Sequence, residues 1–184
     1  EITPSGEIDR QTITTDSFDI RGNALHQRIV KEYWNEGAFE FSEAQDITNT
    51  GYDIHDRVSE SVILNYKNST FSESSFSDMQ DIKYISYDRW GNALSQTIDT
   101  YDSMTADTTK LVDHKVITNT YGDAIAARRG NATVSEVVRY NSLTESVDTQ
   151  IDRTVTTTIH FDIRGNAIDQ ETKTYVLNSA KEEK

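Results

Sequence analysis

Phe18-Asp-Ile-Arg-Gly-Asn-Ala-Leu-His-Gln27 is a segment that returns twice with few changes, as Tyr87-Asp-Arg-Trp-Gly-Asn-Ala-Leu-Ser-Gln96 and Phe161-Asp-Ile-Arg-Gly-Asn-Ala-Ile-Asp-Gln170. Two weaker copies lie between these three, at Tyr52-Asp-Ile-His-Asp56 and at Arg129-Gly-Asn-Ala132. We define the glycine slot of each copy as residues 22, 56, 91, 130 and 165, which are 34, 35, 39 and 35 residues apart. A tyrosine follows each slot by ten or eleven residues, at Tyr33, Tyr66, Tyr101, Tyr140 and Tyr175. The chain is therefore a repeat protein of five copies, and repeats indicate architecture before they indicate chemistry.

The Asp-x-x-Gly pattern of the three strong copies predicts a type I turn in which the aspartate accepts backbone hydrogen bonds and the glycine takes the left-handed conformation. Such a turn is a common hairpin connection with a bulge. Asp56 suits the same slot, because Asp tolerates left-handed geometry better than most residues with a Cβ. We therefore assign structural turn roles to Asp19, Gly22, Asn23, Asp53, Asp56, Asp88, Gly91, Asn92, Gly130, Asn131, Asp162, Gly165 and Asn166.

Strands with one buried face are predicted on both sides of these turns. Val155, Thr157, Ile159, Phe161 and Ile163 share one parity along the chain, and β-branched and aromatic residues dominate the arms. The fold class is therefore all-β, with five antiparallel hairpins that form a solenoid-like stack or, alternatively, a closed barrel or sandwich. We expect one domain over residues 1–184, with repeats at 9–45, 46–80, 81–112, 113–151 and 152–177 and a frayed tail at 178–184.

The stretches between the hairpins are polar and carry turn-forming residues. Lys67–Ser75, Asp102–Asp107 and Asn141–Ser146 are predicted to be return connections. The alanine-rich insert Ala124–Arg129 is the exception, since its composition allows a single helical turn before Gly130.

The composition limits the partners of the chain. A formal charge of −13 argues against nucleic acid and anionic membranes, which clustered Lys and Arg would bind. No stretch reaches the roughly 18 apolar residues of a spanning helix. The chain has no cysteine, which excludes disulfides and thiolate metal sites. The Thr- and Ser-rich strands suit a secreted or cell-surface bacterial protein, and a start at Glu1 without a signal peptide fits a processed protein or an excised segment.

Catalytic and metal-binding motifs are not found. His26, His55, His114 and His160 show no metal-ligand spacing, and neither a nucleophile elbow nor a phosphate loop occurs. Calcium is the one cofactor that acidic loops would suit, but the chain has no EF-hand loop and its repeated aspartates already hold turns. We therefore expect no enzyme activity and no cofactor, with calcium as the minor alternative.

The Tyr87-Asp88-x-x-Gly91-Asn92 segment resembles the YD repeats of the Rhs and teneurin-like proteins, and Phe18 and Phe161 replace the tyrosine conservatively. The resemblance implies a spiral of β-strands with a structural or display role, in a shell or an adhesive stalk. The longer repeat of about 35 residues and the added Ala-Leu-x-Gln depart from that pattern. Five copies are also few for a closed shell.

The glutamines Gln27, Gln96 and Gln170 lie on the same strand face as the aliphatic residues two positions before them, so they are predicted to point inward. One interpretation is a bond to a nearby backbone group or partial exposure. The other is a ladder of stacked amides along the repeat axis.

Three classes of function remain. The first is a structural or adhesive repeat protein that assembles end to end into a filament or surface array, with copies of itself or a longer parent array as its partner. The second is a binding module for a small ligand or carbohydrate, for which Trp34 and Trp90 are the aromatic candidates. The third is a hydrolase without a recognisable signature.

Overall fold

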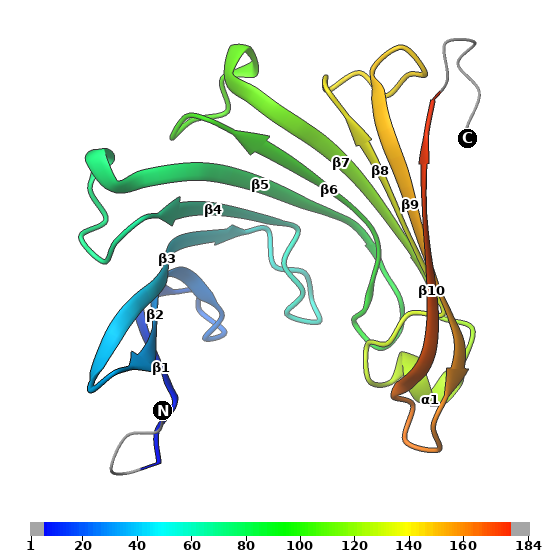
Figure 1. Cartoon of the computed structure of the whole chain (residues 1–184), viewed down its shortest axis with the longest axis horizontal. Coiled ribbons are helices and arrows are strands. Elements are labelled where there is room, and N and C mark those ends of the chain that lie inside the picture. The colour runs from blue at the N-terminus through cyan, green and yellow to red at the C-terminus, as the bar shows by residue number, and fades with distance from the viewer. Residues whose placement is uncertain (1–5, 178–184) are drawn as a thin grey trace. The chain divides into compact units, whose positions relative to one another are not determined.

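The computed structural model describes residues 6–177 and is nearly all-β, which confirms the predicted fold class. Ten strands form an open antiparallel sheet in which each strand lies beside its neighbours in the chain, in the order β1 to β10 (Figure 1). The predicted tail, residues 178–184, lies outside the described residues. The strands are β1 (Asp9–Phe18), β2 (Ala24–Asn35), β3 (Ala38–Thr50), β4 (Glu60–Tyr66), β5 (Phe76–Tyr87), β6 (Ala93–Tyr101), β7 (Leu111–Thr120), β8 (Val134–Tyr140), β9 (Gln150–Phe161) and β10 (Ala167–Val176).

The chain divides into two compact units. The first comprises Glu1–Asp81 and Tyr101–Lys110, and the second comprises Ile82–Thr100 and Leu111–Lys184. The sequence analysis expects one domain over the whole chain. Each compact unit is described by itself below.

The five predicted hairpins correspond to the pairs β1–β2, β3–β4, β5–β6, β7–β8 and β9–β10, each with a glycine slot in its turn. The predicted return connections lie between strands. The first ends in a single turn of 3₁₀-helix at Glu73–Ser75, and a second such turn, at Thr108–Lys110, directly follows the predicted connection Asp102–Asp107. The predicted helical turn is α1 (Ala124–Ala127) in the second compact unit. None of the helices among the described residues has the length and apolar character of a membrane-spanning segment.

The first and last hairpins have the same register. Thr15 lies opposite Gln27 and Phe18 opposite Ala24 in β1–β2, with a bulge between Thr15 and Phe18. The equivalent residues of β9–β10 pair in the same way, since Thr158 lies opposite Gln170 and Phe161 opposite Ala167, with the bulge at the equivalent place. Near-identical turn sequences therefore impose the same pairing of the arms.

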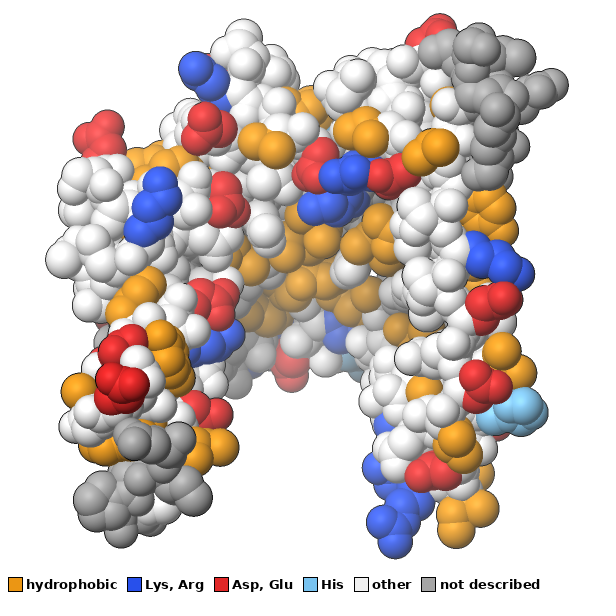
Figure 2. All heavy atoms as spheres, viewed as in Figure 1, with side chains coloured by type: hydrophobic (Ala, Val, Ile, Leu, Met, Phe, Trp, Pro, Cys, Tyr) orange, Lys and Arg blue, Asp and Glu red, His pale blue; other side chains and the backbone are white. Residues whose placement is uncertain are grey.

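Fully buried apolar side chains are few. In the first compact unit Tyr66 is 6% exposed and makes edge contacts with Phe71 and Phe76, at ring distances of 5.3 Å and 6.3 Å. In the second compact unit the buried residues include Ala126 and Ala127 of α1 together with polar Asp99, Asp113, His114 and Thr158. Figure 2 shows hydrophobic side chains interspersed with charged ones on the visible face. Cross-strand pairing and polar contacts therefore carry much of the structure.

Candidate functional site

The turns in copies one, three and five share one hydrogen-bond pattern. In the first turn the Gly22 N–H donates to the Asp19 carbonyl at 3.1 Å, and the Asp19 N–H donates to the Asn23 carbonyl at 2.9 Å. The Asp19 carboxylate accepts bonds from the Arg21 and Asn23 N–H groups, at 2.8 Å and 2.9 Å. The same contacts recur around Asp88 and Asp162. Gly22, Gly91 and Gly165 have φ of 90°, 88° and 80°, so the fourth residue of each turn is in the left-handed region. Type I stays the predicted turn type.

The asparagine after the glycine has a role that the sequence analysis does not specify. In all three turns its Nδ2 donates to the second carboxylate oxygen of the turn aspartate, at 2.8–2.9 Å. The side-chain and backbone hydrogen bonds from Asn23 lower the pKa of Asp19. The backbone and side-chain hydrogen bonds from Asn166 likewise lower the pKa of Asp162. The ionised carboxylate is therefore the form that the turn stabilises.

The second turn keeps this geometry with other residues. Asp56 occupies the glycine slot with φ of 60° and donates its N–H to the Asp53 carbonyl at 3.2 Å. Arg57 replaces the asparagine, and its Nε donates to Asp53 Oδ2 at 2.7 Å. This side-chain hydrogen bond is the main reason that the pKa of Asp53 falls to about 2. In this turn the Arg57 guanidinium donates to the turn aspartate, as the asparagine amide does in the other turns.

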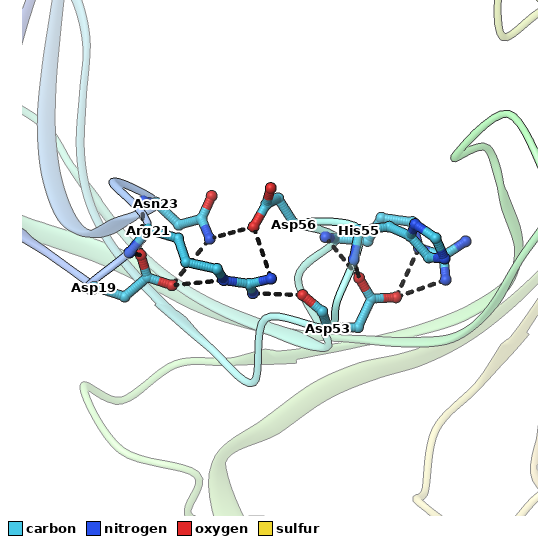
Figure 3. Close-up of polar contacts among 7 residues, drawn as sticks. Asp19, Arg21, Asn23, Asp53, His55 and Asp56 are labelled. Carbon is cyan, nitrogen blue, oxygen red and sulfur yellow. Dashed lines mark hydrogen bonds and ion pairs between the residues drawn. The ribbon is translucent and has the colours of Figure 1, made fainter.

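Neighbouring turns in the first compact unit are linked by side chains (Figure 3). Asn23 Nδ2 donates to Asp56 Oδ1 at 2.8 Å, and Arg21 Nη1 lies 3.1 Å from the same carboxylate oxygen. Arg21 Nη2 also donates to the Asp53 carbonyl. Because Asp56 and Asn23 satisfy each other, the residue that replaces glycine in this turn also connects it to the preceding one.

Asparagines link the turns of the second compact unit as well. Asn92 Nδ2 donates to the Ala127 carbonyl at 2.6 Å, in addition to its bond to Asp88. Asn131 Nδ2 donates to the Gly165 carbonyl at 2.7 Å. The Gly-Asn dipeptide therefore closes its own turn and binds the next one.

The fourth turn differs because of its insert. Asp123 caps α1 by accepting bonds from the Ile125 and Ala126 N–H groups, at 2.9 Å and 2.7 Å. Gly130, with φ of 75°, donates its N–H to the Ala127 carbonyl at 3.1 Å. This glycine ends a helical turn instead of closing a hairpin turn, as left-handed glycines commonly do.

Two of the three glutamines bind threonines of their own hairpins. Gln27 Nε2 donates to Thr15 Oγ1 at 3.0 Å, and Gln170 Nε2 donates to Thr158 Oγ1 at 3.0 Å. Gln96 is half-buried in β6. Both partners are side-chain hydroxyls and not backbone groups, and the amide ladder stays a prediction.

Two histidines have surroundings that the sequence analysis misses. His114 is 5% exposed; its Nδ1 hydrogen-bonds with the Asp99 carboxylate and its Nε2 lies 3.4 Å from Glu145 Oε1. His26 similarly lies between Asp16 and Asp46, at 3.1 Å and 2.6 Å. Their carboxylate partners come from other strands or loops, so only the strand pairing could have revealed them.

In both histidine clusters one ring connects side chains from different strands or loops. In each cluster both ring nitrogens lie within hydrogen-bonding distance of a carboxylate oxygen, and the two carboxylates come from different strands or loops. Among residues 6–177 no serine or threonine hydroxyl is hydrogen-bonded to either ring, and no group of three His, Asp or Glu side chains has a metal-binding arrangement. The clusters therefore connect each histidine to carboxylates of neighbouring strands or a loop.

The second compact unit contains a cavity of about 360 Å³ beside α1, lined by Asp88, Arg89, Trp90, Leu94, Tyr121, Gly122, Ala124 and Ala127. Trp90 is 45% exposed, and the guanidinium carbons of Arg89 and Arg128 lie 4.8 Å and 5.0 Å from its ring centroid. Trp90 stands in a turn position where copies one and five have arginine, and α1 is the insert of the longest repeat. Two departures from the repeat therefore meet at this cavity.

The outer strands form the other candidate site. Within the described sheet β1 pairs only with β2, and β10 pairs only with β9, so one side of each backbone has no partner strand. Almost every residue of both strands is exposed. Charged side chains on these edges, including Arg10, Asp16, Glu171 and Lys173, are the kind that limit indiscriminate edge pairing.

In comparisons with known proteins, no protein-family model, no curated protein and no solved structure matches the chain.

Proposed function

We propose that the protein is a non-enzymatic extracellular repeat protein that assembles end to end into a filament or surface array, in a structural or adhesive role. The observation that carries this proposal is that β1 and β10 are exposed on one edge, whereas the equivalent strands inside the chain are paired on both edges. Exposed edges of regular strands bind other strands through main-chain hydrogen bonds.

The order of strands supports a head-to-tail contact. In each repeat the strand after the turn pairs with the first strand of the next repeat, as β2 does with β3 and β8 does with β9. β10 is a strand after a turn, and β1 is a first strand. A second copy that places its β1 beside β10 would therefore continue the antiparallel order without a change of direction.

The net charge of the chain affects how this assembly should behave. Copies with a formal charge of −13 repel one another, and dissolved salt screens that repulsion. We therefore expect assembly to increase with protein concentration and with moderate ionic strength.

Sedimentation velocity over a concentration series, followed by negative-stain electron microscopy of the heaviest fractions, tests the proposal. The expected result is a progressive series of oligomers and elongated particles of regular axial repeat. A single species of monomer mass at every concentration and ionic strength would contradict end-to-end assembly. A longer parent array is the alternative arrangement, in which flanking repeats of the same chain occupy these edges.

A second candidate function is a small-ligand or carbohydrate-binding module, and the cavity beside α1 favours it. Its lining combines the Trp90 and Tyr121 rings with the Asp88 and Arg89 side chains, and aromatic rings with a few polar groups are typical of such sites. The two tryptophans of the chain allow a direct test, since Trp34→Phe leaves Trp90 as the only indole.

This test titrates the Trp34→Phe protein with a neutral and a uronic-acid oligosaccharide and follows indole fluorescence. A saturable change supports the binding module, and the two sugars separate stacking from charge recognition. No change with either sugar, under conditions where the fold is intact by circular dichroism, would count against it.

A further inference from the structure

We infer that β10 of one copy pairs with β1 of the next copy in one defined register, with Gln170 opposite Ile13 and Thr172 opposite Gln11, and that the Arg10 guanidinium binds the Glu171 carboxylate across the junction. The inference rests on the proposed end-to-end assembly and adds its geometry.

The register comes from two junctions between repeats inside the chain. In β2–β3, Gln27 lies opposite Ile47, which places the residue five past its slot (27 − 22) opposite the residue nine before the next slot (56 − 47). In β8–β9, Ser135 lies opposite Thr156, and the offsets are again five (135 − 130) and nine (165 − 156).

Applied to the outer strands, the same rule fixes the contact between copies. Gln170 is five residues past slot 165, and Ile13 is nine residues before slot 22. Thr172 and Gln11 follow two residues further along each strand, at the offsets of the internal pairs Ile29–Gln45 and Val137–Thr154. Because side chains alternate between faces, a shift by one residue would move every side chain of one strand to the wrong face.

An internal ion pair supports the same register. In β8–β9 Arg153 Nε lies 2.7 Å from Glu136 Oε1. Arg153 is twelve residues before slot 165 and Glu136 is six residues past slot 130. Arg10 and Glu171 have the same offsets, since 22 − 10 is twelve and 171 − 165 is six. The junction between copies would therefore repeat a contact that the chain already makes.

The present ion-pair partners of these two side chains are local and exposed, and the Arg10 guanidinium carbon also lies 3.9 Å from the centroid of the Phe39 ring. Arg10 Nε lies 3.2 Å from Glu7 Oε1, and Glu171 Oε2 lies 2.8 Å from Lys173 Nζ, both within one strand or its approach. Exposed ion pairs of this kind contribute little to stability, so exchanging them for a pair between copies costs little. The register also places Lys173 opposite Arg10, at the offsets of the internal pair Val138–Arg153. Glu171 then lies between two cations, and the junction should respond strongly to charge changes.

Disulfide trapping tests the register, and the chain is suited to it because it contains no cysteine. The protein with Gln11→Cys and Thr172→Cys is oxidised at assembly concentration and separated on a non-reducing gel. We expect a ladder of covalent oligomers, because directly opposed strand residues have Cα separations within the range of a disulfide. The matched control carries Thr12→Cys and Thr172→Cys, which places the two thiols on opposite faces and should yield at least fivefold less ladder.

The outcomes separate the two proposals. If the unmodified chain assembles by sedimentation but both double variants give equal ladders, the register is wrong and end-to-end assembly stands. If the unmodified chain stays monomeric and no ladder forms, both are wrong. A disulfide found by mass spectrometry within single chains would mean that β1 and β10 of one copy pair with each other, which also overturns the inference.

Charge exchange tests the ion pair independently. Glu171→Lys should weaken association by about three- to tenfold, because it replaces an attractive cross-strand charge pair by a repulsive one. Adding Arg10→Glu to that variant should restore association. Glu73→Lys makes the same charge change at an exposed loop position and is the control. Equal effects of Glu171→Lys and Glu73→Lys, without rescue by Arg10→Glu, would exclude the proposed pair.

Discussion

The third and fifth turns of the chain have the same sequence pattern and the same hydrogen bonds, yet their glycines meet different surroundings. Gly91 and Gly165 have φ of 88° and 80°. A Cβ built on Gly91 would have no atom within 4 Å, whereas on Gly165 it would lie 2.9 Å from the Ala126 nitrogen and 3.0 Å from its Cα. Gly91 is exposed and Gly165 is buried. A repeated motif therefore determines the local turn, and the neighbouring repeat determines what the turn packs against.

The cause of the difference is the insert in the fourth repeat. The insert forms α1, and the backbone of Ile125 and Ala126 reaches the fifth turn. Asn131, directly after the insert, also donates to the Gly165 carbonyl. The helical turn of the insert thus packs against the fifth turn. Gly165 is needed there both for its left-handed conformation and because the backbone of α1 comes close to it.

Replacing each glycine by alanine should separate these two contributions. Gly91→Ala should lower the free energy of unfolding by about 1–2 kcal/mol, the usual cost of a left-handed residue with a Cβ. Gly165→Ala carries the same strain plus about 1–3 kcal/mol for the clash with backbone, giving a loss of about 2–5 kcal/mol. Urea unfolding followed by Trp90 fluorescence in a Trp34→Phe background would measure both, because Trp90 belongs to the second compact unit.

Equal losses for the two variants would show that the contact of the fifth turn with α1 has no energetic weight. Valine at either position should be worse than alanine, since a β-branched residue is a stronger outlier at positive φ.

The asparagines offer a second comparison between turns. Asn92 Nδ2 bonds to both Asp88 and the Ala127 carbonyl, whereas Asn166 Nδ2 bonds to Asp162 of its own turn. At about 0.5–1.5 kcal/mol for each hydrogen bond, Asn92→Ala should cost about 2 kcal/mol and Asn166→Ala about 1 kcal/mol. The same urea titration measures both. A larger loss for Asn166→Ala would mean that the bond to the next turn is not what the asparagine contributes.

Much of the fold follows from the sequence because its determinants are local. The Asp-x-x-Gly spacing fixes the turns, and the alternation around Phe161 fixes the strands on either side, so five hairpins and an all-β class could be predicted. The helical turn at residues 124–127 was also predictable, since alanine favours helix and Asp123 is a strong N-cap.

The rest of the candidate site depends on which strands and turns become neighbours. His114 acquires Asp99 from β6 and Glu145 from a loop, and no spacing along the chain identifies either partner. The Asn92 contact with Ala127 crosses to the next turn, where the insert supplies the acceptor carbonyl. The division into two compact units likewise depends on contacts between strands and not on any break in composition.

Acid should weaken the turns that share the aspartate pattern. Burial raises the pKa of Asp88, but the hydrogen bonds from Asn92, Trp90 and Gly91 together outweigh it, so the net shift is downward. The pKa of Asp162 is also lowered. A carboxyl whose pKa is lower in the folded state contributes stability that is present above its unfolded pKa of about 4 and is lost as the pH falls.

The melting temperature, measured from pH 7 to pH 3, should therefore decrease once the pH is below about 4. Asp162→Asn should lower the melting temperature at pH 7 and flatten this dependence. If the melting temperature of the unmodified chain did not change with acid, the ionised carboxylates would not contribute to the stability of the turns.

The smallest change in stability is expected for the second repeat, which has Asp56 in place of glycine in the slot. Asp56→Gly would restore the common residue and relieve the left-handed strain at φ of 60°. It would also remove the carboxylate that Asn23 and Arg21 bind from the preceding turn, at 2.8 Å and 3.1 Å. The contacts are exposed and each contributes little, so gain and loss should nearly cancel, to within about 0.5 kcal/mol. Urea unfolding of a Trp90→Phe background, in which Trp34 reports on the first compact unit, measures the difference. A clear gain in stability would mean that the slot is governed by backbone conformation alone, as at Gly91, whereas a clear loss would place the second turn with Gly165, where the adjoining turn sets the cost of change.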